Sequence, residues 1–304
     1  MAVILLLIPI SEKLMALSVK NNGNLLLSAS AVQLFIFAVP TAFYCKINEL
    51  GFPEHSKARR LHWIDLPFTV ASAFTCFFAA IMLMYLQLNL FPDLSGVSSS
   101  PMQTYSETDP LGVLLAYVIV PAFAEEFFFR GIILSEYSGF KGPYAITVSA
   151  VFFAMLHFSF VQFPIYFVIG VILATITYVT NTSFPSAIIH LIYNATIVYG
   201  GEGLSKFLKE SSSSVILAFL LTVALMISTA SMLSSMETVY VVRSELFNQG
   251  KLPGSRLAAV NKIAKAGKVE KREEKPLNKT VSVFLSPTFF LCILIFVLIT
   301  VDII

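Results

Sequence analysis

Charged residues are scarce in this sequence of 304 residues. Asp, Glu, Lys and Arg together make up 12% of it, whereas hydrophobic residues make up 57% and the mean hydropathy is +0.81. An ordinary soluble domain carries about twice that share of charge. The scarcity therefore excludes a typical soluble globular protein and predicts a chain that crosses a membrane several times.

Cysteine is also rare, and its placement disfavours two further classes of protein. Cys45, Cys76 and Cys292 lie in or beside apolar runs, without C-x-x-C spacing and without an even-numbered framework. We expect them to be small buried hydrophobic residues, which argues against a disulfide scaffold and a thiolate metal site. The chain also lacks internal repeats and low-complexity tracts, which favours a single membrane domain over residues 1–304.

Positive charge is concentrated in two segments rather than spread over a surface, and the formal net charge is only +2. Lys46, Lys57, Arg59 and Arg60 lie in or beside one short segment, and residues 243–279 contain ten basic residues against four acidic ones. Neither cluster predicts a face that could hold nucleic acid, so we expect no nucleic-acid partner. A basic segment beside a membrane favours contact with anionic lipid headgroups instead.

Long apolar runs dominate the rest of the chain. Nine of them approach the length needed to cross ~30 Å of hydrocarbon as a helix. The runs are continuous rather than alternating, which favours helices over the strands of a barrel. We therefore predict an all-α polytopic transmembrane bundle in the lipid bilayer, with about nine spans, eight being possible. The runs cover residues 2–19, 24–46, 66–90, 111–134, 143–160, 163–180, 184–200, 215–236 and 281–301.

The basic residues also predict an orientation. With nine spans, both basic segments fall on one side, which the positive-inside rule makes cytoplasmic. The N-terminus and the loop at residues 243–279 would then lie in the cytoplasm, with the C-terminus outside. Residues 91–110 contain acidic residues but no Lys or Arg, as expected of an outside loop, whereas Lys206 and Lys209 are an exception on that side. The predicted location is the cell membrane.

Three charges interrupt the apolar run at residues 111–134. The stretch P-A-F-A-E-E-F-F-F-R-G, residues 121–131, contains Glu125, Glu126 and Arg130. An ionisable residue inside a span points to function, because charge in hydrocarbon is costly unless it is paired or faces water. In a helix, Glu126 and Arg130 share a face, while Glu125 points about 100° away. We therefore predict an ion pair between Glu126 and Arg130, and a Glu125 carboxylate that is left free for chemistry.

Two histidines lie in neighbouring apolar runs. His157 ends the stretch F-A-M-L-H deep in the fifth run, and the spacing of His190 and Asn194 puts both on one helix face. The other histidines, His55 and His62, lie among basic residues and are expected to be solvated. A single histidine on an apolar helix is most often a hydrogen-bonded structural group. Two histidines, an amide and two carboxylates on nearby spans are better explained by a shared site.

These residues resemble three ordered motifs of a known family. E-E-x-x-x-R at 125–130, F-x-x-x-H at 153–157 and H-x-x-x-N at 190–194 look like the motifs of the CAAX-protease and bacteriocin-processing family of intramembrane proteases, also called the Abi family. Residues 180–190 resemble the segment that leads into the family's third motif, and Gly170 occupies a position where the family commonly has glycine. The resemblance covers about residues 111–200, and implies a catalytic core of four consecutive helices.

The resemblance implies an intramembrane endopeptidase similar to the CAAX prenyl endopeptidases, which is a glutamate-type peptidase. Glu125 and His157 would activate a water for attack on the scissile amide, and His190 and Asn194 would donate hydrogen bonds to the oxyanion. The neighbouring ion pair would support this site. The substrate would be a membrane-associated peptide or protein, and its identity and prenylation stay open.

Three alternatives stay open beside this hypothesis. Two histidines and a glutamate could hold zinc with an open position for water. We expect no cofactor, because the chain lacks an H-E-x-x-H pair and the family's reaction is better described as metal-free. A non-catalytic scaffold or regulator of the immunity type could use the same fold, although complete motifs favour the enzyme. A transporter is the third alternative, since intramembrane charges also mark ion paths.

Overall fold

The computed structural model describes residues 24–47, 61–91, 109–137, 142–248 and 286–301, together with isolated positions between residues 1 and 7 and at residue 57. This part of the chain forms eight helices and no strand, which confirms the all-α fold class. The eight helices correspond to the second through ninth predicted runs. The first run, residues 2–19, lies almost wholly outside the described residues.

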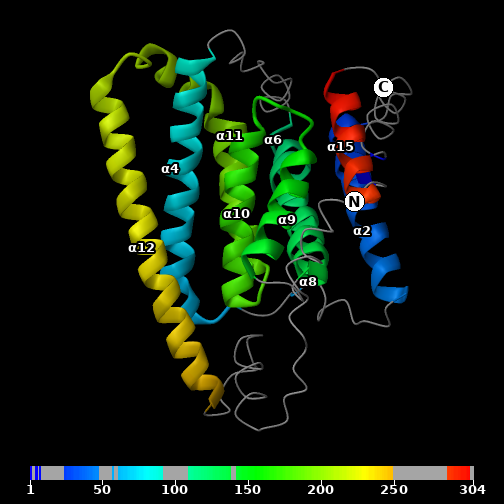
Figure 1. The fold of residues 1–304 in the computed structure, drawn as a ribbon. Coiled ribbons are helices and arrows are strands. Elements are labelled where there is room, and N and C mark those ends of the chain that lie inside the picture. The colour runs from blue at the N-terminus through cyan, green and yellow to red at the C-terminus, as the bar shows by residue number, and fades with distance from the viewer. Residues whose placement is uncertain are drawn as a thin grey trace.

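Seven of these helices are single elements and one is composite (Figure 1). The composite helix begins at Pro110 and ends at Glu136, and two π-helical segments interrupt it. The single helices are α2 (Leu25–Ile47), α4 (Leu66–Leu90), α9 (Gly142–Met155), α10 (Phe163–Thr180), α11 (Phe184–Glu210), α12 (Val215–Asn248) and α15 (Pro287–Thr300). The composite helix consists of α6 (Pro110–Val113), η2 (Leu114–Ile119), α7 (Val120–Glu126), η3 (Phe127–Ile133) and α8 (Leu134–Glu136).

Proline sets the start of most of these helices. Pro67, Pro110, Pro164 and Pro185 each lie in the first two helical positions, where a missing N–H leaves no hydrogen bond unmade. At the composite helix, the side chain of Asp109 accepts a hydrogen bond from the Gly112 backbone N–H at 2.9 Å, which caps the helix. The starts of the apolar helices are therefore encoded locally.

Five of the described helical segments are long and apolar enough to cross a membrane. They are Leu25–Ile47, Trp63–Leu90, Pro110–Glu136, Phe163–Thr180 and Val215–Val242. Helices α9 and α15 are apolar but have only 14 residues each. Helix α11 is long enough to cross a membrane, but its second half carries charged residues. Lys206 and Lys209 lie in this second half, on a helix and not in a loop. The predicted count of nine spans is therefore approximate.

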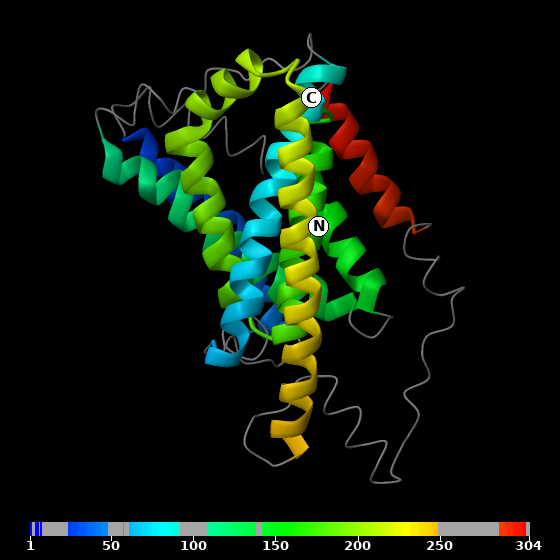
Figure 2. The same ribbon diagram turned by 90° about the vertical axis from the view of Figure 1, so that its left-hand side faces the viewer.

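The helices form a bundle with α12 at one edge. Helix α12 packs along α4, and α10 packs against both α4 and α9 (Figure 1). The composite helix contacts α2 on one side and α11 on the other, and Figure 2 shows it inclined to α4 and α12. Helix α15 joins the bundle through aromatic contacts, Phe289 with Phe152 and Phe296 with Phe163. This arrangement brings the composite helix, α9, α10 and α11 together.

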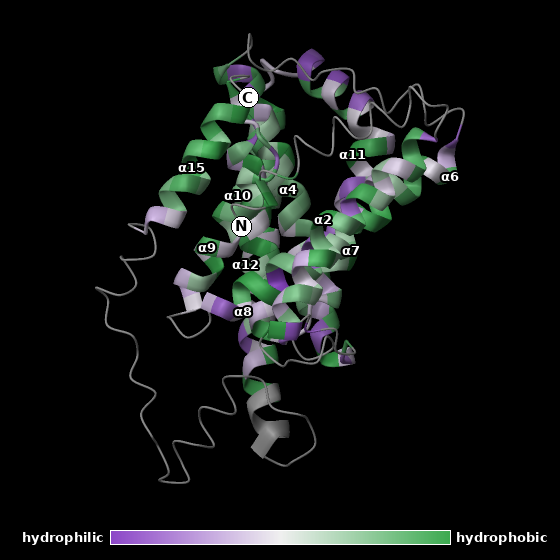
Figure 3. Cartoon of the chain, turned by 90° about the vertical axis from the view of Figure 1, so that its right-hand side faces the viewer, coloured by the Kyte–Doolittle hydropathy of each residue, from purple (hydrophilic) through white to green (hydrophobic). Residues whose placement is uncertain are grey.

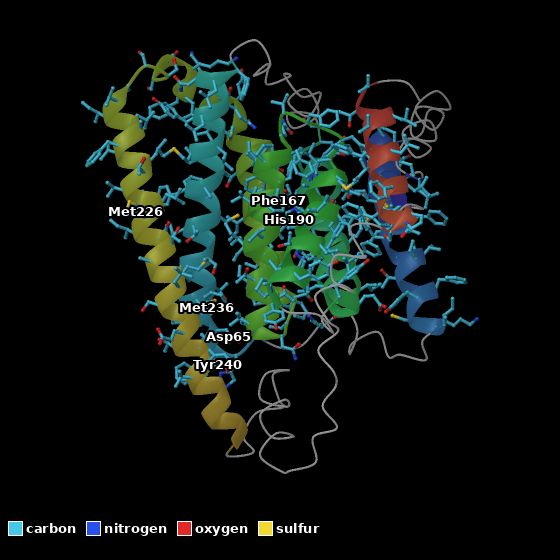
Figure 4. All side chains as sticks on the ribbon, viewed as in Figure 1. Asp65, Phe167, His190, Met226, Met236 and Tyr240 are labelled. Atoms are coloured by element: carbon cyan, nitrogen blue, oxygen red, sulfur yellow. The ribbon has the colours of Figure 1, made fainter. Side chains whose placement is uncertain are left out.

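Apolar residues also cover much of the outside. Figure 3 shows hydrophobic residues along most of α15, and the apolar side chains of Val70, Phe74 and Phe77 on α4 are exposed. Helix α12 is the most exposed of the long helices: Val215 is 80% exposed, and Met226 points away from the bundle (Figure 4). A long helix with an apolar outer face is typical of contact with lipid.

The fifth predicted run differs from the structure. We expected His157 deep in a span over residues 143–160, but α9 ends at Met155 and His157 lies in a turn before α10. The turn closes through short-range hydrogen bonds, from His157 N to Ala154 O and from Phe158 N to Met155 O. Phe158 then takes a left-handed backbone conformation with φ of 44°, which ends the helix. An apolar composition does not distinguish such a turn from a helix.

Two further predictions concern the cysteines and the histidines outside the motifs. Cys45, Cys76 and Cys292 are buried and form no disulfide with another described residue, as predicted. His62 is half-buried and not simply solvated, because its Nδ1 accepts a hydrogen bond from the Ile64 N–H at 3.3 Å and so caps η1 (Trp63–Asp65). His55 lies outside the described residues.

Candidate active site

The predicted ion pair is present in the interior of the bundle. Arg130 Nε lies 3.0 Å from Glu126 Oε2, and both side chains are 0% exposed. The two atoms are close enough to pair, although they are not aligned as a hydrogen bond. Glu126 is the last residue of α7 and Arg130 lies in the π-helical segment η3, a type of helix that is frequent at functional sites. Because neither side chain is exposed, the ion pair is fully desolvated.

The second oxygen of Glu126 binds a residue from a distant part of the chain. His190 Nδ1 lies 3.1 Å from Glu126 Oε1 (His190 is labelled in Figure 4). A carboxylate can only accept, so His190 donates through Nδ1–H, and its Nε2 is left for another partner. Ser186, one turn earlier on α11, also approaches this carboxylate. The sequence predicted His190 as a site residue but not this link to Glu126.

Arg130 is held on two further sides. Its Nη2 donates to the backbone carbonyl of Gly170 on α10 at 3.4 Å. Its guanidinium also lies 4.6 Å from the centre of the Phe153 ring, within the range of a cation–π contact. Gly170 permits the close approach, because a Cβ there would meet the Ala150 Cα at 3.0 Å. Helices α9 and α10 therefore help to hold the cation that pairs with Glu126.

Glu125 is buried like its neighbour but is bonded differently. Its side chain is 6% exposed, and its Oε2 has no hydrogen-bond partner in the described part of the chain. It lies within electrostatic range of His190, Glu126 and Arg130. A buried carboxylate oxygen without a partner is rare in proteins and calls for an explanation, such as a bound water or a functional role. The sequence-based expectation of a free carboxylate agrees with this arrangement.

His157 is held by its own turn. Its Nδ1 lies 3.0 Å from the Phe153 carbonyl, which can only accept, so the ring donates through Nδ1–H and leaves Nε2 as an acceptor. Its ring also stacks on Tyr166, with 3.5 Å between centroids. Among the described residues, no hydrogen bond or ion pair joins His157 directly to Glu125. Both lie beside His190, Glu125 within its electrostatic range and His157 on the other side of a shared ring contact with Phe153.

Phe153 connects the histidines, a role that the sequence did not reveal. Its ring lies edge-on to His157 at 5.1 Å and to His190 at 5.6 Å, measured between centroids. It is also the ring under the Arg130 guanidinium. In the sequence, Phe153 is marked only as the first residue of the F-x-x-x-H motif. Asn194 lies one turn after His190 and is half-buried, and its side-chain amide makes no hydrogen bond to another described residue.

The donor groups of the site bear on the metal alternative. Among the described residues, no three His, Cys, Asp or Glu side chains converge in a way that could hold a metal ion. His190 and Glu126 are bonded to each other, and His157 faces Tyr166. The arrangement therefore resembles a hydrogen-bonded cluster more than a set of metal ligands.

The fold and the site together define a polytopic helical membrane protein with a buried cluster of carboxylate, guanidinium and imidazole groups. Residues 107–196 match the family described as Rce1-like, type II CAAX prenyl endopeptidase Rce1-like. The matched segment contains all three motifs and nearly coincides with residues 111–200, which confirms the resemblance to the CAAX-protease family. Searches of the curated proteins and of the solved structures found no match.

Proposed function

We propose that this chain is an intramembrane endopeptidase that uses Glu125 and His157 to activate a water. One observation carries the proposal: Glu125 is buried and keeps an oxygen without a hydrogen-bond partner among the described residues, inside the segment that matches an endopeptidase family. A partnered carboxylate would have a structural explanation. An unpartnered one beside charged groups is suited to hold a reacting water.

The proposed reaction is hydrolysis of a peptide bond. A water held by Glu125 Oε2 gives up a proton to Glu125 or to Nε2 of His157, the nitrogen that is free to accept. The resulting hydroxide attacks the carbonyl carbon, the C–N bond breaks, and the departing amine takes the proton. Both residues therefore return to their initial states after one turnover.

His190 and Asn194 are proposed to stabilise the oxyanion. With Nδ1–H of His190 engaged by Glu126, only Nε2 can face a substrate, and it donates there when the ring is protonated. The Glu126 carboxylate orients the His190 ring through this bond, and Arg130 keeps the Glu126 side chain in place. Asn194, one turn along α11 and without a partner among the described residues, supplies an amide donor. Glu126 and Arg130 are thus support residues in this proposal.

The proposed substrate is a membrane-associated peptide or protein whose cleavable bond lies near the membrane. The family name refers to prenylated CAAX proteins, so a prenylated peptide with a C-terminal CAAX sequence is the first probe to use. An unprenylated peptide of the same sequence on a membrane anchor is the matched probe. Cleavage of only the first would assign the prenyl group to recognition.

The test of the proposed function is cleavage of these peptides by the purified chain and by E125Q and H157A. Glu125→Gln keeps the side-chain volume but removes the base, and the loss of a general base lowers the rate by ~100–10,000-fold. His157→Ala should have a similar effect. The matched control is Glu210→Gln, an exposed glutamate at the end of α11, which should cleave at the rate of the parent chain.

Thermal unfolding in detergent should show that E125Q and H157A still fold. Equal cleavage by the parent chain and E125Q would remove Glu125 from the mechanism. A folded parent chain that cleaves neither peptide would favour the alternative of a non-catalytic scaffold.

Chelation tests the metal-free mechanism separately. Because the proposed water is activated by Glu125 and His157, a strong chelator should leave the cleavage rate unchanged. The same rate should be measured after dialysis against metal-free buffer, with and without added zinc. If chelation stops cleavage and zinc restores it, the metalloprotease mechanism replaces this one, since a bound metal is removed by chelators.

A further inference from the structure

His157 has a neighbour that belongs to none of the three motifs. The ring of Tyr166, on α10, lies nearly parallel to the imidazole, with 3.5 Å between centroids and 16° between planes. We infer that Tyr166 is a positioning residue for His157, an inference that rests on the proposed function. By stacking on the imidazole, it keeps Nε2 of His157 in the place where a water can give up a proton.

The geometry of His157 explains why such a residue is needed. His157 follows the end of α9, so its backbone lacks the support of a regular helix. The hydrogen bond from Nδ1–H to the Phe153 carbonyl fixes one point of the ring but lets the ring rock about the axis of that bond. A parallel ring at van der Waals distance blocks this rocking. The hydrogen bond and the stack together fix the position of Nε2.

Tyr166 is itself held firmly. It lies on α10, and its hydroxyl donates to Gln162 Oε1 at 3.0 Å. The turn that carries His157 is tied to α4 by a short hydrogen bond from Gln87 Nε2 to the Val161 carbonyl. The backbone of Phe158 is left-handed, a conformation that costs energy for an aromatic residue and persists only where the surroundings enforce it. These contacts make the turn and Tyr166 one structural unit.

Tyr166 also lies on the side of the site where the chemistry is proposed. It is within electrostatic range of Glu125, although its hydroxyl is engaged by Gln162. The phenol is therefore placed to hold His157 and not to exchange protons with the substrate. On this basis the aromatic ring matters, and the hydroxyl matters much less.

Two substitutions separate the ring from the hydroxyl. Tyr166→Phe keeps the stack and removes only the hydroxyl, so kcat should stay close to that of the parent chain. Tyr166→Leu removes the stack, and kcat should fall by up to ~100-fold with KM unchanged, as expected when a reacting group is displaced by about 1 Å. The matched control is Tyr178→Leu on the same helix, where the ring packs near Leu134, Ala145 and Ala174, away from His157.

A double substitution separates positioning from a general loss of structure. If Tyr166 acts through His157, adding Tyr166→Leu to H157A should lower the residual rate no further. An equal additional loss in that background would show that Tyr166 acts on the structure at large, and would overturn the inference.

An experiment that does not depend on activity closes the test. The chain has four histidines, and H157A identifies the resonance of His157 in the NMR spectrum of histidine-labelled protein in detergent. Stacking on an aromatic ring shifts the imidazole protons upfield, so the parent chain and Y166F should share a shifted signal that Y166L loses. An unchanged His157 signal in Y166L would overturn the inference. This result stands even if no peptide is cleaved, which would contradict only the proposed function.

If Y166L fails to fold, Tyr166→Met supplies the same comparison with a flexible side chain that fills irregular space.

Discussion

At the level of single residues, two adjacent glutamates have different surroundings. Glu126 has Arg130 on one oxygen and His190 on the other. Glu125 is equally enclosed but keeps an oxygen without a partner in the described part of the chain. Because consecutive residues of a helix point about 100° apart, one turn can place a structural carboxylate beside a reactive one. This difference is the basis for assigning support to Glu126 and chemistry to Glu125.

The buried ion pair predicts a stability effect. Arg130→Ala would leave Glu126 buried beside Glu125 without its cation, and breaking a buried pair typically costs ~3–5 kcal/mol. We therefore expect a much lower yield of folded protein and a lower unfolding temperature in detergent. The control is Lys206→Ala, which removes an exposed cation on α11 and should unfold like the parent chain. Normal yield and full peptidase activity of R130A would show that the pair does not support the site.

The sequence allowed part of this site to be predicted. The Glu126–Arg130 pair follows from four-residue spacing within one helix, which is local information. The bond between Glu126 and His190 joins residues 64 positions apart, so it depends on how α11 packs against α7. The stacking of Tyr166 on His157 depends in turn on the path of the turn between α9 and α10. Motifs thus identified the residues, and packing decided their partners.

At the level of elements, α9 and α10 approach each other closely at Gly170, beside the site. A Cβ on Gly170 would lie 3.0 Å from the Ala150 Cα and 3.2 Å from its Cβ. The Ala150 Cα is a backbone atom, so it cannot rotate out of the way as a side-chain atom could. In the sequence, only the family resemblance singles out Gly170, because the family commonly has glycine at this position. The structure adds the physical reason, since a Cβ at this position would clash with the backbone of α9. The Gly170 carbonyl also accepts a hydrogen bond from Arg130.

This contact predicts the effect of one added methyl group. Gly170→Ala should force α9 and α10 apart, and overpacking of this kind costs ~1–3 kcal/mol. Peptidase activity should fall as well, because the displaced carbonyl no longer holds Arg130. Gly203→Ala is the control, since a Cβ at that helical position meets nothing within 4 Å. It should unfold at the same temperature as the parent chain or slightly higher. A G170A protein with unchanged stability and activity would contradict this account of the contact.

At the level of the whole molecule, apolar composition predicted the class of fold well and the lengths of the helices less well. The runs at residues 66–90 and 163–180 coincide with α4 and α10. The run at residues 215–236 is shorter than α12, because polar residues such as Glu237 and Thr238 continue the helix beyond the apolar part. Hydropathy describes where a chain prefers lipid, whereas the end of a helix depends on caps, turns and neighbours.

The orientation of the chain in the membrane remains a prediction of the sequence. Ten basic residues against four acidic ones occupy residues 243–279, which lie mostly outside the described residues, and the positive-inside rule places such a segment in the cytoplasm. A cysteine at Lys265 should therefore resist an impermeant thiol reagent in intact cells and react in inverted vesicles. Cys45, Cys76 and Cys292 are buried, so they should add little background. A cysteine at Ser99, in the segment predicted to lie outside, is the control and should show the opposite pattern. If the impermeant reagent labels Lys265→Cys in intact cells, the segment lies outside and the predicted orientation is wrong.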